Sequence, residues 1–236
     1  MSTPNTKAVE STSTEESPSG GNNQSPGALQ EIWLALAQTP GIGVSITDSH
    51  GKLLFVNNTS LVMFSGDSNI DYQGKSISDF HPSSFVEERL ALIQRVLKEN
   101  KPISIDHIYN GRRICSTVWP IRDHTPPYNR VLVVSRPSSG DALDQLIPSN
   151  IETIETSYID LGPLSVLTRR ELEVAVLLGH GLTVPKVAAT LHRSPKTIER
   201  HRESIGKKLS MHSQAELVHL ITCMGLELKH VELQRY

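Results

Sequence analysis

Four helix start signals follow one another within Leu167–Leu220, and they constrain the fold of this chain more than any other feature. Thr168 stands three residues before Glu171, the spacing of a capping box, in which each side chain can bind a backbone N–H at the helix start. The next three starts carry hydroxyl residues in the N-cap position, at Thr183, Ser194 and Ser213. We therefore predict four short helices, with prolines in the first turns of the second and third.

The third of these helices, from Ser194 to about Leu209, has two unlike faces. Its packed side repeats at spacings of three, four and four residues, at Ile198, His201, Ile205 and Leu209. The opposite row is polar and mostly cationic, and contains Lys196, Glu199, Arg200, Glu203 and Lys207. A helix packed on one side and cationic on the other is typical of the recognition helix of a helix-turn-helix unit, so the sequence predicts double-stranded DNA as a partner.

The whole block resembles the LuxR/NarL-type helix-turn-helix domain, and the resemblance covers roughly a quarter of the chain. The residues that agree with the family pattern are Leu167, Thr168, Arg170, Glu171, Glu173, Val174, Leu177, Gly181, Leu182, Ala188, Leu191, Ser194, Thr197, His201, Ile205, Lys208 and Leu209. The resemblance implies a transcription regulator that binds promoter DNA, forms a homodimer there and has RNA polymerase as a further partner.

The resemblance also implies which residues contact DNA. The base-reading face of the third helix corresponds to Glu199, Arg200 and Glu203. Phosphate contacts near the helix starts correspond to Thr183, Lys186, Ser194, Lys196 and Thr197, and Lys207 is a further phosphate candidate. An arginine can bind guanine O6 and N7 together, which makes Arg200 the leading candidate for sequence recognition.

Two departures from the family pattern limit this assignment. Pro185 stands where the family commonly has a lysine, although Lys186 is its neighbour. Glu199 stands where another basic residue is frequent, and a carboxylate can accept from cytosine N4 but repels phosphate. The alternative is a protein-interaction adaptor with a vestigial DNA-binding face.

The charge of the chain is unevenly distributed. Residues 164–236 contain eleven Lys and Arg against seven Asp and Glu, a net charge of +4, whereas residues 1–163 carry −6. This asymmetry favours a polyanion partner for the C-terminal part alone. Its histidines His180, His192, His212, His219 and His230 have no metal-ligand spacing, and their protonation below about pH 6.5 is expected to make this part more cationic.

The middle segment alternates strand and helix signals. An amphipathic helix at 29–37 precedes a hairpin at 44–57, a long helix is expected at 83–99, and strands follow at 103–109, 112–121 and 131–135. This order, with the opening VSITDSHGKLLFVNN, resembles a PAS sensor domain. The predicted fold class is α+β: a PAS-like five-stranded antiparallel sheet with helices, followed by a separate all-α four-helix helix-turn-helix domain.

PAS domains as a family hold small ligands or mediate dimerisation, so the resemblance implies signal input without identifying the signal. The flavin-binding run is missing before the long helix, and His81, at the start of that helix, is interpreted as a capping or exposed residue rather than a haem ligand. Phe55, Phe64, Phe85, Trp119 and Ile121 are interpreted as core. Neither a phosphorylated receiver nor an acyl-homoserine-lactone domain fits the residues, and no cofactor is predicted.

These signals divide the chain into five parts. We expect a disordered tail at 1–27, a PAS-like domain at 28–137, a linker at 138–163 that is partly helical, a helix-turn-helix domain at 164–225 and a C-terminal tail at 226–236. Cys115 and Cys223 have no CxxC spacing, which is typical of a reducing compartment, and no run approaches a membrane span. We therefore expect a cytoplasmic protein that is not an enzyme, because no phosphate loop, metal cluster or nucleophile–base pair is present.

Overall fold

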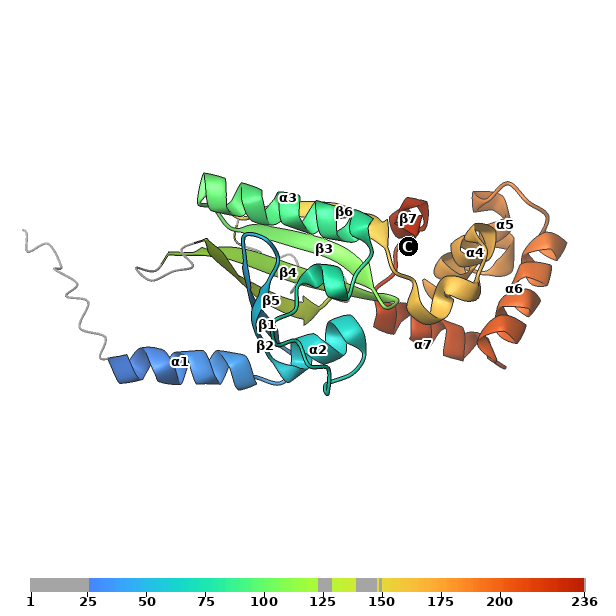
Figure 1. Cartoon of the computed structure of the whole chain (residues 1–236). Coiled ribbons are helices and arrows are strands. Elements are labelled where there is room, and N and C mark those ends of the chain that lie inside the picture. Colours follow the sequence, from blue (N-terminus) through green and yellow to red (C-terminus); the bar gives the residue numbers. More distant parts are fainter. Residues whose placement is uncertain (1–25, 123–128, 139–147, 149, 236) are drawn as a thin grey trace, which may run out of the picture.

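The computed structural model describes residues 26–122, 129–138, 148 and 150–235, and shows a sheet with helices followed by a compact helical part (Figure 1). The elements before the helical part are α1 (Pro26–Gln38), β1 (Gly43–Asp48), β2 (Leu53–Val56), α2 (Asn58–Ser65), η1 (Ile77–Asp79), α3 (Ser83–Glu99), β3 (Ile103–Tyr109), β4 (Arg112–Ile121), β5 (Arg130–Pro137) and β6 (Glu152–Ile159). The expected hairpins and the long helix are confirmed. Residues 1–25 of the expected tail and residues 139–147 and 149 of the expected linker lie outside the described residues.

The sheet has the strand order β2-β1-β5-β4-β3-β6-β7. Its first five strands are antiparallel, which confirms the PAS-like five-stranded sheet. Helix α3 packs against β4 and β5. The side chains Ile93, Val96, Ile105, Val118 and Val131 form a core between the helix and the sheet.

Asn57 joins three elements of the sheet part, α1, β1 and α2. It is the N-cap of α2, and its Oδ1 accepts hydrogen bonds from the N–H groups of Val44 and Ser60 at 2.9 Å each. Its Nδ2 donates to the carbonyls of Ala37 and Ile42. Because all four bonds of a largely buried amide are made, α1, β1 and α2 are held in one arrangement.

The helical part contains η3 (Gly162–Val166), α4 (Arg169–Gly179), α5 (Val184–Thr190), α6 (Pro195–Leu209) and α7 (Gln214–Met224), followed by η4 (Leu228–Glu232) and β7 (Gln234–Arg235). The capping box of Thr168 and Glu171 is present, and Ser194 and Ser213 cap α6 and α7. Thr183 occupies the N-cap of α5, but its hydroxyl makes no capping hydrogen bond. A Cβ at Gly179 would lie 2.5 Å from the Cβ of Ile221, so only glycine permits this approach of α4 and α7.

The connection between the two parts differs from the expected linker. Part of residues 138–163 forms β6, which pairs in parallel with β3 instead of forming a helix. Part of the expected tail 226–236 forms η4 and β7, and β7 pairs with β6. Ile108 of β3 and Ile159 of β6 belong to the same hydrophobic cluster as the helical part. Tertiary pairing along the sheet edge, which local sequence signals do not report, therefore joins the two parts into one body.

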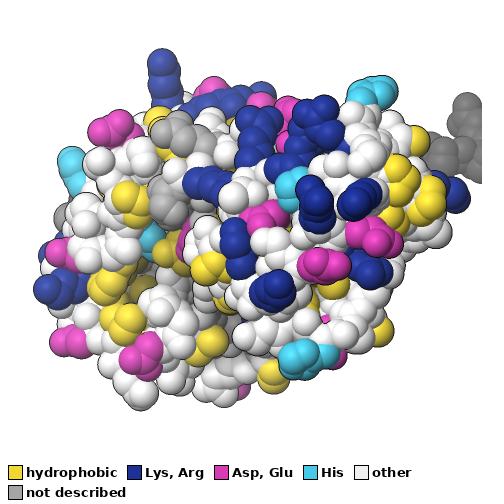
Figure 2. Space-filling view, turned by 90° about the vertical axis from the view of Figure 1, so that its right-hand side faces the viewer, with side chains coloured by type: hydrophobic (Ala, Val, Ile, Leu, Met, Phe, Trp, Pro, Cys, Tyr) yellow, Lys and Arg dark blue, Asp and Glu magenta, His cyan; other side chains and the backbone are white. Residues whose placement is uncertain are grey.

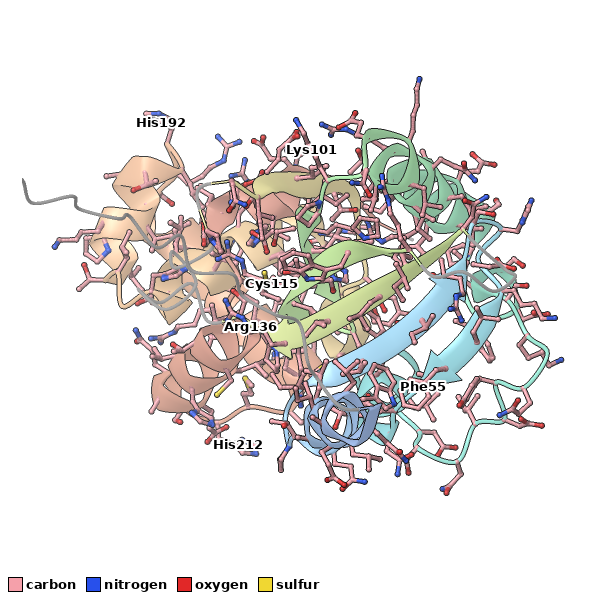
Figure 3. All side chains as sticks on the ribbon, turned by 90° about the vertical axis from the view of Figure 1, so that its left-hand side faces the viewer. Phe55, Lys101, Cys115, Arg136, His192 and His212 are labelled. Carbon is pink, nitrogen blue, oxygen red and sulfur yellow. The ribbon has the colours of Figure 1, made fainter. Side chains whose placement is uncertain are left out.

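A polar contact adds to this junction. The Arg113 side chain on β4 binds the Asp106 carboxylate, with its Nη2 2.6 Å from Oδ2, and also binds Glu227 beyond α7. Cys115 and Arg136, labelled in Figure 3, are cross-strand partners on β4 and β5 near this junction. In the described part of the chain, no helix has the length and apolar character to cross a membrane.

Candidate functional site

The two faces of α6 are separated as predicted. Ile198 and Ile205 are buried, and His201 and Leu209 are partly buried beside them. On the opposite side, Lys196, Glu199, Arg200, Glu203 and Lys207 are all exposed. Figure 2 shows Lys and Arg gathered on the end of the molecule that carries α5 and α6, with a few acidic side chains among them. The helix therefore presents one continuous polar row to solvent.

The predicted phosphate contacts lie at the starts of α5 and α6, except Lys207, which lies in the last turn of α6. Thr183 and Lys186 are exposed at the first turn of α5, where Pro185 is also exposed. Ser194 is exposed and accepts from the Thr197 N–H at 3.2 Å, while the two hydroxyls lie 2.8 Å apart. Helix starts present unpaired N–H groups and a partial positive charge, which favour an anion.

A buried carboxylate fixes α6 against α4. Glu171, which is 5% exposed, accepts from Lys208 Nζ at 2.7 Å, from Ser204 Oγ at 2.6 Å and from the Thr168 N–H at 2.8 Å. Burial alone would raise the pKa of this carboxyl, but the bonds from Lys208, Ser204 and Thr168 outweigh it and lower the pKa to about 2. One side chain thus joins the start of α4 to the flank of α6 and sets the angle of the polar row.

Two exposed cations of this surface are absent from the predicted set. Arg202 lies on the flank of α6, two residues beyond Arg200, and Arg193 ends the turn before α6. Arg202 was not predicted because residues two apart on a helix point to different sides, which places it off the row that contains Arg200. Its position along the helix was the sequence signal that could have identified it as a flanking cation. Both add positive charge beside the predicted contacts.

One expectation about the histidines is wrong in part. His230 is buried, and its Nδ1 accepts from the Glu227 N–H at 2.9 Å. Burial, with the nearby charge of Arg113, lowers its pKa to about 4. His230 therefore adds no positive charge near pH 6. A sequence pattern cannot show this, because η4 folds back against the sheet edge.

The sheet part contains a separate cavity of about 140 Å³. It lies among the sheet, η1 and α3, and the aromatic side chains Phe64, Phe80 and Phe85 contribute to its largely apolar wall. An apolar cavity of about 150 Å³ is large enough to bind benzene. Of the aromatic residues interpreted as core, Phe64 and Phe85 line this cavity, whereas Trp119 is 40% exposed on the sheet, where that interpretation is wrong.

Polar atoms cluster on the sheet side of the cavity. His107 is 4% exposed, its Nε2 lies 2.9 Å from Ser116 Oγ, and Ser116 continues to Ser135 Oγ at 2.8 Å. Within the described residues, His107 Nδ1 and Thr47 Oγ1 have no hydrogen-bond partner. Burial, followed by the charge of Arg89, lowers the pKa of His107 well below its usual value, so the ring is neutral and can donate or accept.

His81 is placed differently from the expectation. It lines the cavity, its Nδ1 lies 2.9 Å from Tyr109 Oη, and its ring packs against Phe85 with centroids 4.6 Å apart. Burial and then the charge of Arg89 lower its pKa to about 4. His81 is therefore a cavity residue and neither a helix cap nor a solvent-exposed group. Among the described residues, no group of three His, Cys, Asp or Glu side chains lies together as a metal site would require.

Comparison with known proteins supports the assignment of the helical part. Residues 165–221 match the family model described as bacterial regulatory proteins, luxR family. The uncharacterized response regulatory protein YgeK of Escherichia coli K12 is 43% identical over 123 residues, which are 52% of this chain and 78% of that protein. This chain belongs to the luxR family. Its capping box, its recognition-type helix and its buried Glu171 cluster all fall inside the matched residues.

A second relative by sequence matches a smaller share of this chain, and a solved structure matches most of it. The response regulator UvrY of Escherichia coli K12 is 32% identical over 88 residues, 37% of this chain. Those residues span 38% of the length of UvrY. The VqmA–ligand–DNA complex from Vibrio cholerae is similar in structure, with 18% identity, a TM-score of 0.46 and coverage of 87% of this chain and 94% of that one. Because that TM-score is below 0.5, the fold assignment rests on strand order and helix placement.

Proposed function

We propose that this protein is a sequence-specific DNA-binding transcription regulator in which α6 enters the major groove of a promoter element. The observation that carries the proposal is the exposed polar row of α6, held at a set angle by the buried Glu171 cluster. Membership of the luxR family supports it. As a regulator rather than an enzyme, the chain would act in the cytoplasm, with RNA polymerase as a further partner.

The roles of the row follow from the chemistry of DNA. Arg200 would bind guanine O6 and N7, and Glu199 would accept from cytosine N4 or orient Arg200. Glu203 completes the base-reading face. The remaining predicted contacts would bind phosphates, namely Thr183, Lys186, Ser194, Lys196, Thr197 and Lys207. A helix-turn-helix protein reads two half-sites about one turn apart, so we propose a homodimer on DNA.

The cavity would supply the signal input of the regulator. Its wall is mostly apolar, and none of the described side chains that line it is acidic, so a cationic ligand would lack a counter-charge. The one lining guanidinium, Arg89, is already ion-paired with Glu88 at 3.1 Å. The cavity therefore favours a small, uncharged, largely apolar molecule with one hydrogen-bonding group for His107 Nδ1 or Thr47 Oγ1.

The test is selection of a randomised duplex library by the purified full chain at two salt concentrations, with sequencing of the bound fraction. We expect an enriched, twofold-symmetric motif. Arg200→Ala should cost about 1–3 kcal/mol on that motif and relax one base position in each half-site. Arg112→Ala, an exposed arginine on β4 with the same charge change, is the matched control and should retain the motif.

Two results would contradict the proposal. No enrichment with the unmodified chain would leave the adaptor function, for which Pro185 and Glu199 are the sequence evidence. Enrichment that survives Arg200→Ala would place base recognition elsewhere on the molecule.

A further inference from the structure

Strand β6 contains an irregularity where it passes the cavity wall. Its pairing with β3 is regular as far as Asp106 opposite Glu155, and the next pair is Ile108 opposite Ile159. Over this step β3 advances by two residues and β6 by four, so β6 bulges opposite His107. Such a bulge interrupts the ladder and leaves backbone groups that need other partners.

The partner of the bulge is Glu88 of α3, which runs alongside β6 (Figure 1). Glu88 Oε1 accepts from the Ser157 N–H at 2.8 Å, and Glu88 Oε2 accepts from Thr156 Oγ1 at 2.5 Å. Thr156 is 3% exposed. A single carboxylate therefore takes the place of the missing strand partner and holds the bulge in its observed shape.

The same carboxylate is one contact away from the cavity. Glu88 Oε2 lies 3.1 Å from Arg89 Nη1, and the Arg89 guanidinium lies over the Phe85 ring at 4.6 Å. Arg89, Phe85 and His107 all line the cavity. Two sets of contacts therefore link the cavity to the bulge. One is the Arg89–Glu88 ion pair, and the other is His107 on the facing strand β3.

Between the bulge and the helical part, hydrogen bonds and burial hold the chain in place. Asp160 accepts from the N–H groups of Asn110 at 3.0 Å and Gly162 at 2.9 Å, and its carbonyl accepts from the Gly111 N–H at 2.8 Å. Leu161, the next residue, is buried in the core shared with α4. A change in the bulge is therefore carried into the segment that positions the helices, since a packed junction shifts as a unit.

We infer that Glu88 is a positioning residue that couples occupancy of the cavity to the placement of the DNA-binding helices, through the bulge at Thr156–Ser157. The DNA readout of this inference rests on the proposed function, whereas the link from the cavity to the bulge does not. In this role Glu88 contacts neither DNA nor the ligand.

A double-mutant cycle tests the coupling. Val133→Phe extends a side chain into the cavity and serves as a fixed occupant, and Leu53→Phe on β2 does the same from another strand. DNA affinity is measured on a selected duplex for each filling variant, alone and combined with Glu88→Gln. Glu87→Gln, an exposed carboxylate on the same helix, is the matched control. We expect filling to change the dissociation constant by about 5-fold or more, and by less than about 2-fold when combined with Glu88→Gln.

Hydrogen exchange across residues 150–160 supplies a readout that needs no DNA. Filling the cavity should change protection of the Ser157 amide in the unmodified and Glu87→Gln backgrounds, and leave it unchanged with Glu88→Gln. An equal effect of filling in all backgrounds would overturn the inference, as would no effect of either folded filling variant. If the chain binds no DNA but the exchange pattern is as expected, the proposed function fails while the link to the bulge holds.

Discussion

The polar row of α6 and the cavity beneath α3 are two sites built in opposite ways. Every predicted base-reading residue lies within one helix, between Glu199 and Glu203, and the spacing of 3.6 residues per turn brings them together. The cavity is lined by His81, which lies just before α3, by Thr47 of β1 and by His107 of β3. It therefore exists only once the sheet has formed. A surface on one helix can be predicted from the local sequence. A cavity formed by several strands can be predicted only when the register of the sheet is known.

The largest effect is expected at the junction between the two regions, where a mutation tests whether they unfold together. Ile159→Ala removes buried contacts in the core that β6 shares with α4. We expect a loss of about 2–5 kcal/mol in the free energy of unfolding. Denaturant unfolding followed at Trp33 and Trp119 and by far-ultraviolet circular dichroism measures it. A helical transition that is unchanged by Ile159→Ala would show that the two regions fold independently.

The next largest loss of stability is expected within the helical region, at the buried carboxylate of Glu171. Glu171→Gln removes the charge that binds Lys208 and Ser204, and should cost about 1.5–3 kcal/mol of unfolding free energy. Because the pKa of Glu171 in the fold is about 2, below its ordinary 4.5, its contribution is present above pH 4.5 and is lost as the pH falls toward 2. Urea titrations at pH 7 and pH 3 measure both statements. Glu199→Gln, on the exposed face, is the control, and an equal loss there would contradict the assignment.

A smaller effect is expected at the DNA surface, where loss of a phosphate contact should weaken binding to all duplexes equally. Lys196→Ala should weaken binding to selected and random duplexes by the same factor, since a phosphate contact carries no sequence information. The slope of log affinity against log salt should fall by about 1. Fluorescence anisotropy at several salt concentrations measures the slope. A loss confined to the selected duplex would instead make Lys196 a base contact.

The smallest effect is expected in the cavity region as a pH dependence. His81 has a pKa near 4 in the fold against an ordinary 6.5, so the unfolded chain binds its proton more readily between these values. Stability from neutral His81 is therefore complete above pH 6.5 and declines as the pH falls toward 4. His81→Asn should flatten the fall in melting temperature between pH 7 and pH 4.5. An unchanged profile would mean that His81 does not titrate with unfolding.

The sequence by itself determined the helical region in detail, because its information is local. The capping box at Thr168, the caps at Ser194 and Ser213 and the two faces of α6 each depend on residues within a few positions of one another. The strand signals and the long helix of the PAS-like domain were likewise readable, since alternation and periodicity act within one element.

The tertiary structure alone decided the features that depend on distant pairing. The segment Glu152–Ile159 becomes a strand because β3 offers it an edge, although its sequence indicated a partly helical linker. His81 and His107 enter one cavity, and His230 is buried, through contacts with residues far away in the chain. Glu88 binds Thr156 across 68 positions, and no local pattern marks it. Burial and strand register arise between elements, so they have no signature within any one of them.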